Sequence, residues 1–308
     1  MYGKRALVVE GGAMRGVFAS GVLDAFLAKR FQPYDFAVGV SAGASTLIGY
    51  LAGQQGRSYK VITELATQKA FFNPGRFARG GDLIDVRWLW FNSELVYPLD
   101  KRAFFNSIPM LATVTSVETG EADYYRINPE NIDDVMQATC ALPLAYRQSP
   151  CFSGGCYTDG GVADSIPVRE AYRRGARDIT VVLSHPLGYE MPDAKYPWLV
   201  KRILGRYPGV ADAMVRRADN YNASLDFIRN PPSDCVVRVL TPTDDFTVER
   251  LTMNRKKLEA GYRMGFEAGL GHAMRRDDGI MGLADEDCPF CMPESQVYPN
   301  HLKVSAPE

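Results

Sequence analysis

Residues 6–16, ALVVEGGAMRG, and residues 35–43, DFAVGVSAG, each run from an apolar, strand-like segment into a turn that contains glycine. A helical pattern follows both turns, because apolar residues recur at helical spacing over residues 15–29 and again over residues 42–52. Two strand–turn–helix units in succession are typical of a parallel sheet covered by helices. The sequence therefore predicts an α/β fold.

The rest of the chain continues the alternation of strands and helices. A chain of 308 residues with 46% hydrophobic content can bury one large core. We expect one domain over residues 1–280, with an irregular insertion or lid at about 53–108 and a basic helical segment at about 195–228. Residues 281–308 read as an irregular tail. Further elements are expected as a hairpin over 110–127, a helix that ends before Pro143, a strand at 151–159, a strand at 176–184 and a helix at 252–276.

Charge and hydropathy exclude several classes of protein. The formal net charge is −1, so no global positive field favours nucleic acid. The first ten residues, MYGKRALVVE, lack the apolar core of a secretory signal, and no apolar run approaches the roughly 20 residues that cross a bilayer. We expect a cytoplasmic protein that at most adheres to a membrane surface.

Six cysteines are too few and too scattered for a disulfide framework, so reduced thiols are expected. Cys288 and Cys291 have the spacing of metal ligands and His301 follows them, but no second pair completes a four-ligand set. The sequence predicts no metal and no cofactor.

The stretch GVSAG, residues 39–43, matches the nucleophile motif G-x-S-x-G between a predicted strand and a predicted helix. In that motif the serine occupies a strained turn, and the glycines remove side chains that would collide with neighbouring elements. Ser41 is therefore the candidate nucleophile. The alternative is a plain strand-to-helix turn in which the serine caps the helix.

The turn GGAMRG, residues 11–16, follows the neighbouring strand and should meet Ser41 at the same edge of the sheet. The backbone N–H groups of Gly12 and Ala13 are the candidate donors to an oxyanion that forms when the serine attacks an ester. Arg15 places a cation in the first turn of the next helix, where it needs a partner or a role. A dinucleotide site is disfavoured, because Ala13 stands where that fingerprint requires glycine.

Two residues compete as the group that removes the serine proton. His185 follows a predicted strand, and the order Ser41, Asp159, His185 is that of α/β-hydrolase triads. Asp159 in DGG also follows a strand-like segment, and a dry pocket would raise its pKa enough for it to act as a base by itself. Both arrangements use Asp159.

The motifs EGGAMRG, GVSAG and DGG in this order resemble the patatin-like phospholipase family. The resemblance implies a three-layer α/β/α sandwich with a mostly parallel central sheet, and cleavage of acyl esters by a serine–aspartate dyad without histidine. Carried to this chain, it implies Ser41 as the nucleophile, Asp159 as its partner, and Gly11, Gly12, Ala13 and Arg15 as the oxyanion loop. Ala13 departs from the family's third glycine, and an alanine there would be strained if the loop needs a positive φ.

Other functions stay open at this point. A carboxylesterase or thioesterase that acts on soluble acyl substrates could use the same site. The glycine turn could instead bind a phosphate or a lipid headgroup in a non-enzymatic module. Residues 88–91, WLWF, and residues 198–206, WLVKRILGR, have compositions suited to a lipid surface or equally to core packing.

Overall fold

The computed structural model describes residues 3–277, and a single mixed sheet runs through them. Its strands lie in the order β5-β6-β3-β2-β1-β7-β8, and β4 pairs with β3. The central pairs β3–β2, β2–β1, β1–β7 and β7–β8 are parallel, whereas the pairs that involve β4, β5 and β6 are antiparallel. The strand bounds are β1 Lys4–Val9, β2 Phe36–Val40, β3 Met110–Ser116, β4 Ala122–Arg126, β5 Cys151–Phe152, β6 Gly155–Asp159, β7 Ala176–Val182 and β8 Val236–Leu240.

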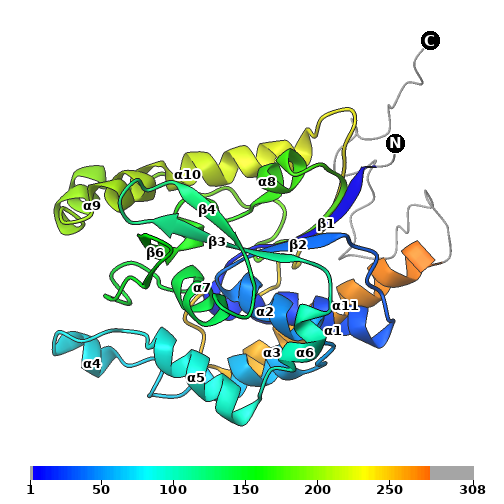
Figure 1. Ribbon diagram of the computed structural model, residues 1–308, viewed down its shortest axis with the longest axis horizontal. Coiled ribbons are helices and arrows are strands. Elements are labelled where there is room, and N and C mark those ends of the chain that lie inside the picture. Colours follow the sequence, from blue (N-terminus) through cyan, green and yellow to red (C-terminus); the bar gives the residue numbers. More distant parts are fainter. Residues whose placement is uncertain (1–2, 278–308) are drawn as a thin grey trace.

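Helices cover both faces of the sheet (Figure 1). One face carries α8 (Val168–Arg173) and α10 (Pro208–Arg229), and the other carries α1 (Gly16–Ala28), α2 (Ala42–Leu51) and α11 (Arg255–Asp277). The predicted three-layer α/β/α sandwich with a mostly parallel sheet is thereby confirmed. Outside residues 53–108, the other helices are α7 Ile132–Thr139 and α9 Pro197–Ile203, together with short 3-10 turns at Ala13–Arg15 and Gly160–Val162.

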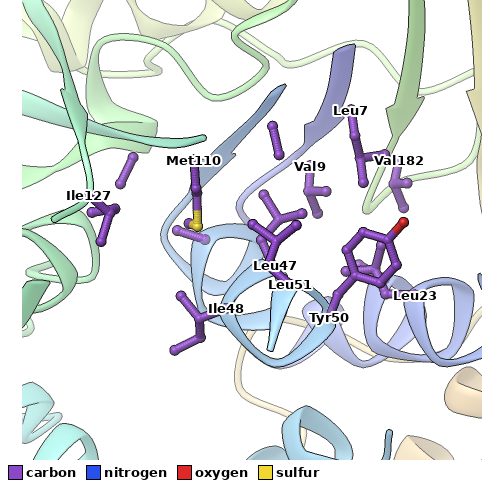
Figure 2. Packing of buried hydrophobic residues seen from close by; sticks show 14 of the residues in the cluster. Leu7, Val9, Leu23, Leu47, Ile48, Tyr50, Leu51, Met110, Ile127 and Val182 are labelled. Carbon is purple, nitrogen blue, oxygen red and sulfur yellow. The ribbon is translucent and has the colours of Figure 1, made fainter. Parts of the chain in front are cut away.

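Strand β1 shows how the apolar core divides between the two faces. Successive side chains of a strand point to opposite sides, so Ala6 and Val8 pack with α8 and α10, whereas Leu7 and Val9 pack with α1 and α2. Figure 2 shows Val9 next to Leu47 of α2, and Leu7 beside Val182. Because both faces are buried, the strand reads as a continuous apolar run, as parallel strands do.

Segment 53–108 is largely helical, which corrects the prediction of irregular chain. Its elements are α3 Arg57–Lys60, a π-helical turn Val61–Leu65, α4 Pro74–Ala78, α5 Val86–Val96 and α6 Lys101–Phe105. Three of these helices begin at capping side chains, since Asn73, Asp85 and Asp100 each accept a hydrogen bond from a backbone N–H three residues later. The segment lies against the α2 side of the sheet (Figure 1).

The stretch predicted as one strand at 151–159 forms a hairpin of β5 and β6. Cys151 and Cys156 lie directly opposite each other in it and form a disulfide, so the expectation of reduced thiols is wrong for these two residues. Cys140 and Cys235 are free thiols. The predicted tail 281–308, with Cys288, Cys291 and His301, lies outside the described residues.

Candidate active site

Ser41 stands in the sharp turn between β2 and α2. Its backbone has φ 52° and ψ −122°, a conformation that an L-residue adopts only under strain. A Cβ on Gly39 would lie 2.7 Å from the Cα of Ala44, and one on Gly43 would lie 2.4 Å from the carbonyl oxygen of Val9. Only glycine therefore allows the turn to pack this tightly against the sheet.

A pair of threonines holds the strained turn in place. The backbone N–H of Ser41 donates a hydrogen bond to Thr139 Oγ1 at 2.9 Å, and Thr139 Oγ1 donates to the carbonyl of Thr113 at 2.6 Å. Thr113 and Thr139 are both fully buried. These two hydrogen bonds thus link the end of α7 and strand β3 to Ser41, the residue whose backbone is strained.

Asp159 ends β6 and contacts Ser41 directly. Ser41 Oγ donates a hydrogen bond to Asp159 Oδ2 at 2.7 Å, and the N–H of Gly161 donates to Asp159 Oδ1 at 2.8 Å. The side chain is buried, and burial raises the pKa of Asp159, although the hydrogen bonds and the charges of Arg217 and Arg250 oppose this. A carboxyl with a raised pKa beside a serine hydroxyl is suited to exchange a proton with it.

The glycine turn lies beside this pair. Gly11, Gly12 and Ala13 line the same pocket as Ser41 and Asp159. Ala13 has φ 51°, so the alanine adopts the left-handed conformation that favours glycine. Arg15 is not among the residues that line the pocket; its Nε donates to Ser184 Oγ at 3.4 Å.

The described histidines lie apart from the Ser41–Asp159 contact. The ring of His185 stacks on Tyr189 with a centroid distance of 3.7 Å. Burial and the nearby arginines lower the pKa of His185 to about 3. The ring of His272 packs against Phe26 and Phe31. Within residues 3–277, no histidine side chain is hydrogen-bonded to Ser41 or Asp159.

The pocket above Ser41 has a volume of about 300 Å³ and mainly apolar walls. Its size is at the lower end of the range for small-molecule sites, roughly 300–1,000 Å³. The helical segment 53–108 contributes much of the wall, with Val61, Ile62, Phe71, Phe72, Leu89 and Trp90. Trp90 is fixed by a hydrogen bond from Nε1 to Asp133 Oδ1 at 3.0 Å. The arrangement offers a serine hydroxyl, a carboxylate and backbone N–H groups at the floor of an apolar cavity.

Residues 7–172 match the family model of patatin-like phospholipases. The chain belongs to the patatin-like phospholipase family. Membership supports a lipid acyl hydrolase activity at the level of the family. Residues 207–274 of this patatin-like chain match a second model, described as a domain of unknown function (DUF6363).

Two similar proteins extend the comparison. The uncharacterized protein YjjU of Escherichia coli K12 is 32% identical over 312 residues, a match that covers 96% of this patatin-like chain and 85% of YjjU. The crystal structure of VipD from Legionella pneumophila matches with a TM-score of 0.50 and 13% identity over 88% of this chain and 67% of that one. The similarity to VipD concerns the fold alone.

Several residues of the patatin-like site were not predicted from the sequence. Thr113 and Thr139 support the nucleophile turn, and Arg217 and Arg250 line the pocket. No local pattern distinguishes these residues from other polar residues of the chain. They reach the site through strand pairing and helix packing between distant segments.

The strained turn of this patatin-like chain leads to a test of stability. Ser41→Gly is expected to be more stable than Ser41→Ala by about 1 kcal/mol, because glycine relieves about 1–3 kcal/mol of strain at a positive φ and adds about 0.4–1 kcal/mol of entropy to the unfolded chain. Both variants lack the hydroxyl, so their difference in urea unfolding free energy isolates the backbone. A glycine variant that is less stable than the alanine variant by about 0.4–1 kcal/mol, the entropy term alone, would show that Ser41 is unstrained.

Proposed function

We propose that the chain is a serine lipid acyl hydrolase of the phospholipase A or lysophospholipase type, in which Ser41 is the nucleophile and Asp159 is its general base. The observation that carries the proposal is the 2.7 Å hydrogen bond from Ser41 Oγ to Asp159 Oδ2 at the floor of an apolar pocket. Direct contact between the two groups removes the need for an intervening histidine. The raised pKa of Asp159 brings its basicity closer to that of usual catalytic bases.

In the proposed reaction Ser41 Oγ attacks the acyl carbonyl carbon while Asp159 accepts the hydroxyl proton. The carbonyl oxygen becomes an oxyanion, and Asp159 then protonates the departing alcohol as the tetrahedral intermediate collapses to an acyl-enzyme. A water molecule that gives its proton to Asp159 attacks the acyl-enzyme and releases the fatty acid. Ser41 regains its proton from Asp159 at the end of the cycle.

The oxyanion is assigned to the turn that contains Gly11, Gly12 and Ala13, with Arg15 adding positive charge behind it. Support comes from the position of the turn, since its three residues share the pocket with Ser41. Backbone N–H groups that are fixed in advance stabilise the developing charge more than the ground-state ester. In this assignment Arg15 acts from below the pocket, because its side chain is buried against Ser184.

Segment 53–108 is proposed as the lid of one catalytic domain that spans about residues 1–280. Its apolar side chains line the pocket, so an acyl chain would pack against them. A series of nitrophenyl esters of increasing chain length tests this role. Rising kcat/KM up to a medium or long acyl chain supports a lipid substrate, whereas a preference for the acetate ester indicates a soluble acyl substrate.

A fluorophosphonate probe tests the nucleophile. The probe is expected to label the wild-type protein at Ser41, as located by mass spectrometry of the labelled peptide, and to leave Ser41→Ala unlabelled. Heat-denatured protein serves as the control for nonspecific reaction. Absence of label on Ser41 in folded protein would favour a non-enzymatic module that binds phosphate or lipid headgroups.

Contact with a membrane surface is proposed for α9 and its flanks. No helix among residues 3–277 is long and apolar enough to cross a bilayer. On α9, Trp198 is 63% exposed and Ile203 is 55% exposed, and the exposed cations Lys201 and Arg202 lie between them. An exposed apolar strip interleaved with cations fits an anionic lipid surface.

The protein is therefore expected to sediment with vesicles that contain phosphatidylglycerol more than with pure phosphatidylcholine vesicles. Trp198→Ser should lower the partition coefficient by about 10-fold, the effect of removing one buried large apolar side chain. Met274→Ser is the matched control, because Met274 is 51% exposed on α11, a helix that lies apart from α9 (Figure 1). Equal binding of both variants would exclude α9 as the contact surface.

A further inference from the structure

Two arginines line the pocket without forming an ion pair to any carboxylate of residues 3–277. Arg217 of α10 and Arg250, which lies between β8 and α11, both line the pocket that contains Ser41 and Asp159. Arg217 Nε donates to the carbonyl of Gly161 at 2.6 Å, and no hydrogen bond leaves the side chain of Arg250 toward any residue of 3–277. Neither guanidinium forms an ion pair within that part of the chain.

The carboxylates near these arginines are already engaged. Asp159 accepts hydrogen bonds from Ser41 and Gly161. Glu10, which is buried and feels the charge of Arg15, accepts from the backbone N–H of Ser184 at 2.6 Å and from the hydroxyl of Tyr221 at 3.0 Å. The two pocket arginines therefore keep donors that no carboxylate of the described chain uses.

The positive charge at this place is concentrated. Burial lowers the pKa of Arg217 and the charge of Arg250 lowers it further, although the charges of Asp159 and Glu10 oppose this. Burial and the charges of Arg15, Arg250 and Arg217 together lower the pKa of His185 to about 3. Cations that are held together and partly desolvated are costly unless an anion joins them.

We infer that Arg217 and Arg250 bind the phosphate in the alcohol part of the ester substrate, next to the Ser41 hydroxyl. The inference rests on the proposed function, because the alcohol part is the group that leaves Ser41. A phosphate presents several oxygens that two planar guanidinium forks can share, which suits this pair better than a single carboxylate would. Both arginines lie in residues 207–274, so the region that matches a domain of unknown function supplies substrate selection to the patatin-like site.

Arg250 is the residue to change first, since Arg217 also holds the carbonyl of Gly161 beside Asp159. The measured quantity is the ratio of kcat/KM for dihexanoyl glycerophosphate to kcat/KM for dihexanoylglycerol, two esters that differ by the phosphate. Arg250→Gln is expected to lower this ratio by about 10- to 100-fold, the effect of losing one charge-assisted contact. Arg250→Lys keeps the charge without the planar fork and should lower the ratio less.

The matched control is Arg216→Gln. Arg216 is the neighbour of Arg217 on α10, but its side chain is 53% exposed and pairs with Glu121 at 3.2 Å. This variant should leave the ratio within about twofold of the wild-type value. A ratio that Arg250→Gln leaves unchanged, or that Arg216→Gln lowers equally, would overturn the inference.

Binding to the Ser41→Ala variant separates this inference from the proposed function. Calorimetric titration with dihexanoyl glycerophosphate should give binding that weakens when Arg250→Gln is added, whether or not the wild-type protein hydrolyses either ester. Arg250-dependent binding without any hydrolysis would refute the hydrolase and retain the anion site. Hydrolysis with no preference for the phosphate ester would refute the anion site alone. Equal, Arg250-dependent affinity for inorganic phosphate would identify a site for the free anion and overturn the assignment to substrate.

Discussion

Ser41→Ala is expected to lower kcat/KM for a soluble acyl ester by at least about 10⁴-fold while the protein stays folded. The hydroxyl is the atom that would form the acyl-enzyme, and alanine leaves nothing in its place. The remaining rate would come from the backbone N–H groups of residues 11–13 and from binding in the pocket. Initial rates with a nitrophenyl ester, alongside circular dichroism spectra of both proteins, measure the effect.

Ser45→Ala supplies the control within the same pocket. Ser45 lies one turn further along α2 and also lines the cavity, but its hydroxyl contacts Cys140 Sγ at 3.5 Å instead of Asp159. Removal of the Ser45 hydroxyl should change kcat/KM by less than about 10-fold, the effect of one hydrogen bond. Comparable losses in both variants would mean that Ser41 only shapes the pocket.

The two glycine turns could be predicted from the sequence because each depends on local backbone geometry. Gly39 and Gly43 are required where other residues would collide with the sheet and with α2, and this requirement is visible as G-x-S-x-G. The resemblance to the family, whose loop has a third glycine, indicated that Ala13 would be strained at a positive φ, and the structure gives it φ 51°. Local constraints of this kind leave a short pattern in the chain.

The partner of Ser41 could not be chosen by the same means. Asp159 ends a strand and His185 follows one, and the order of the residues in the chain does not distinguish between them. The pairing of β6 with β3 brings Asp159 to Ser41, whereas His185 follows β7 and stacks on Tyr189. Pairing between strands that are distant in the sequence determines which of the two residues contacts Ser41, and single-sequence patterns carry little information about it.

The helices of segment 53–108 were missed although their caps were readable. Asn73, Asp85 and Asp100 are common N-cap residues, and proline follows Asn73 at the first helical position. The aromatic cluster WLWF drew the interpretation toward an irregular lid, but these residues form the first half of α5. Short helices that gain their stability from tertiary packing show weak periodicity, so capping signals are the better guide to them.

Asp159→Asn is expected to slow ester hydrolysis by about 10²–10⁴-fold and to raise the free energy of unfolding at pH 7 by about 1 kcal/mol. The loss of rate follows because the carboxamide cannot accept the proton of Ser41. The gain in stability follows because burial raises the pKa of Asp159 in spite of its hydrogen bonds and nearby arginines, so the ionised form is disfavoured in the folded protein.

The pH dependence of the unfolding free energy tests whether Asp159→Asn stabilises the protein. A carboxyl whose pKa is higher in the folded state than in the unfolded state stabilises the folded protein at pH values below the unfolded-state pKa of 3.8. This stabilisation is lost as the pH rises through the folded-state pKa. The advantage of Asp159→Asn should therefore be present at pH 7 and shrink as the pH falls toward 3.8 in urea unfolding measurements. Asp212→Asn is the control of opposite sign, because the hydrogen bond from Lys201 lowers the pKa of that exposed carboxyl. An asparagine at residue 159 that destabilises the protein at pH 7 would show that the arginines and hydrogen bonds outweigh burial, and Asp159 would then be too weak a base for the proposed reaction.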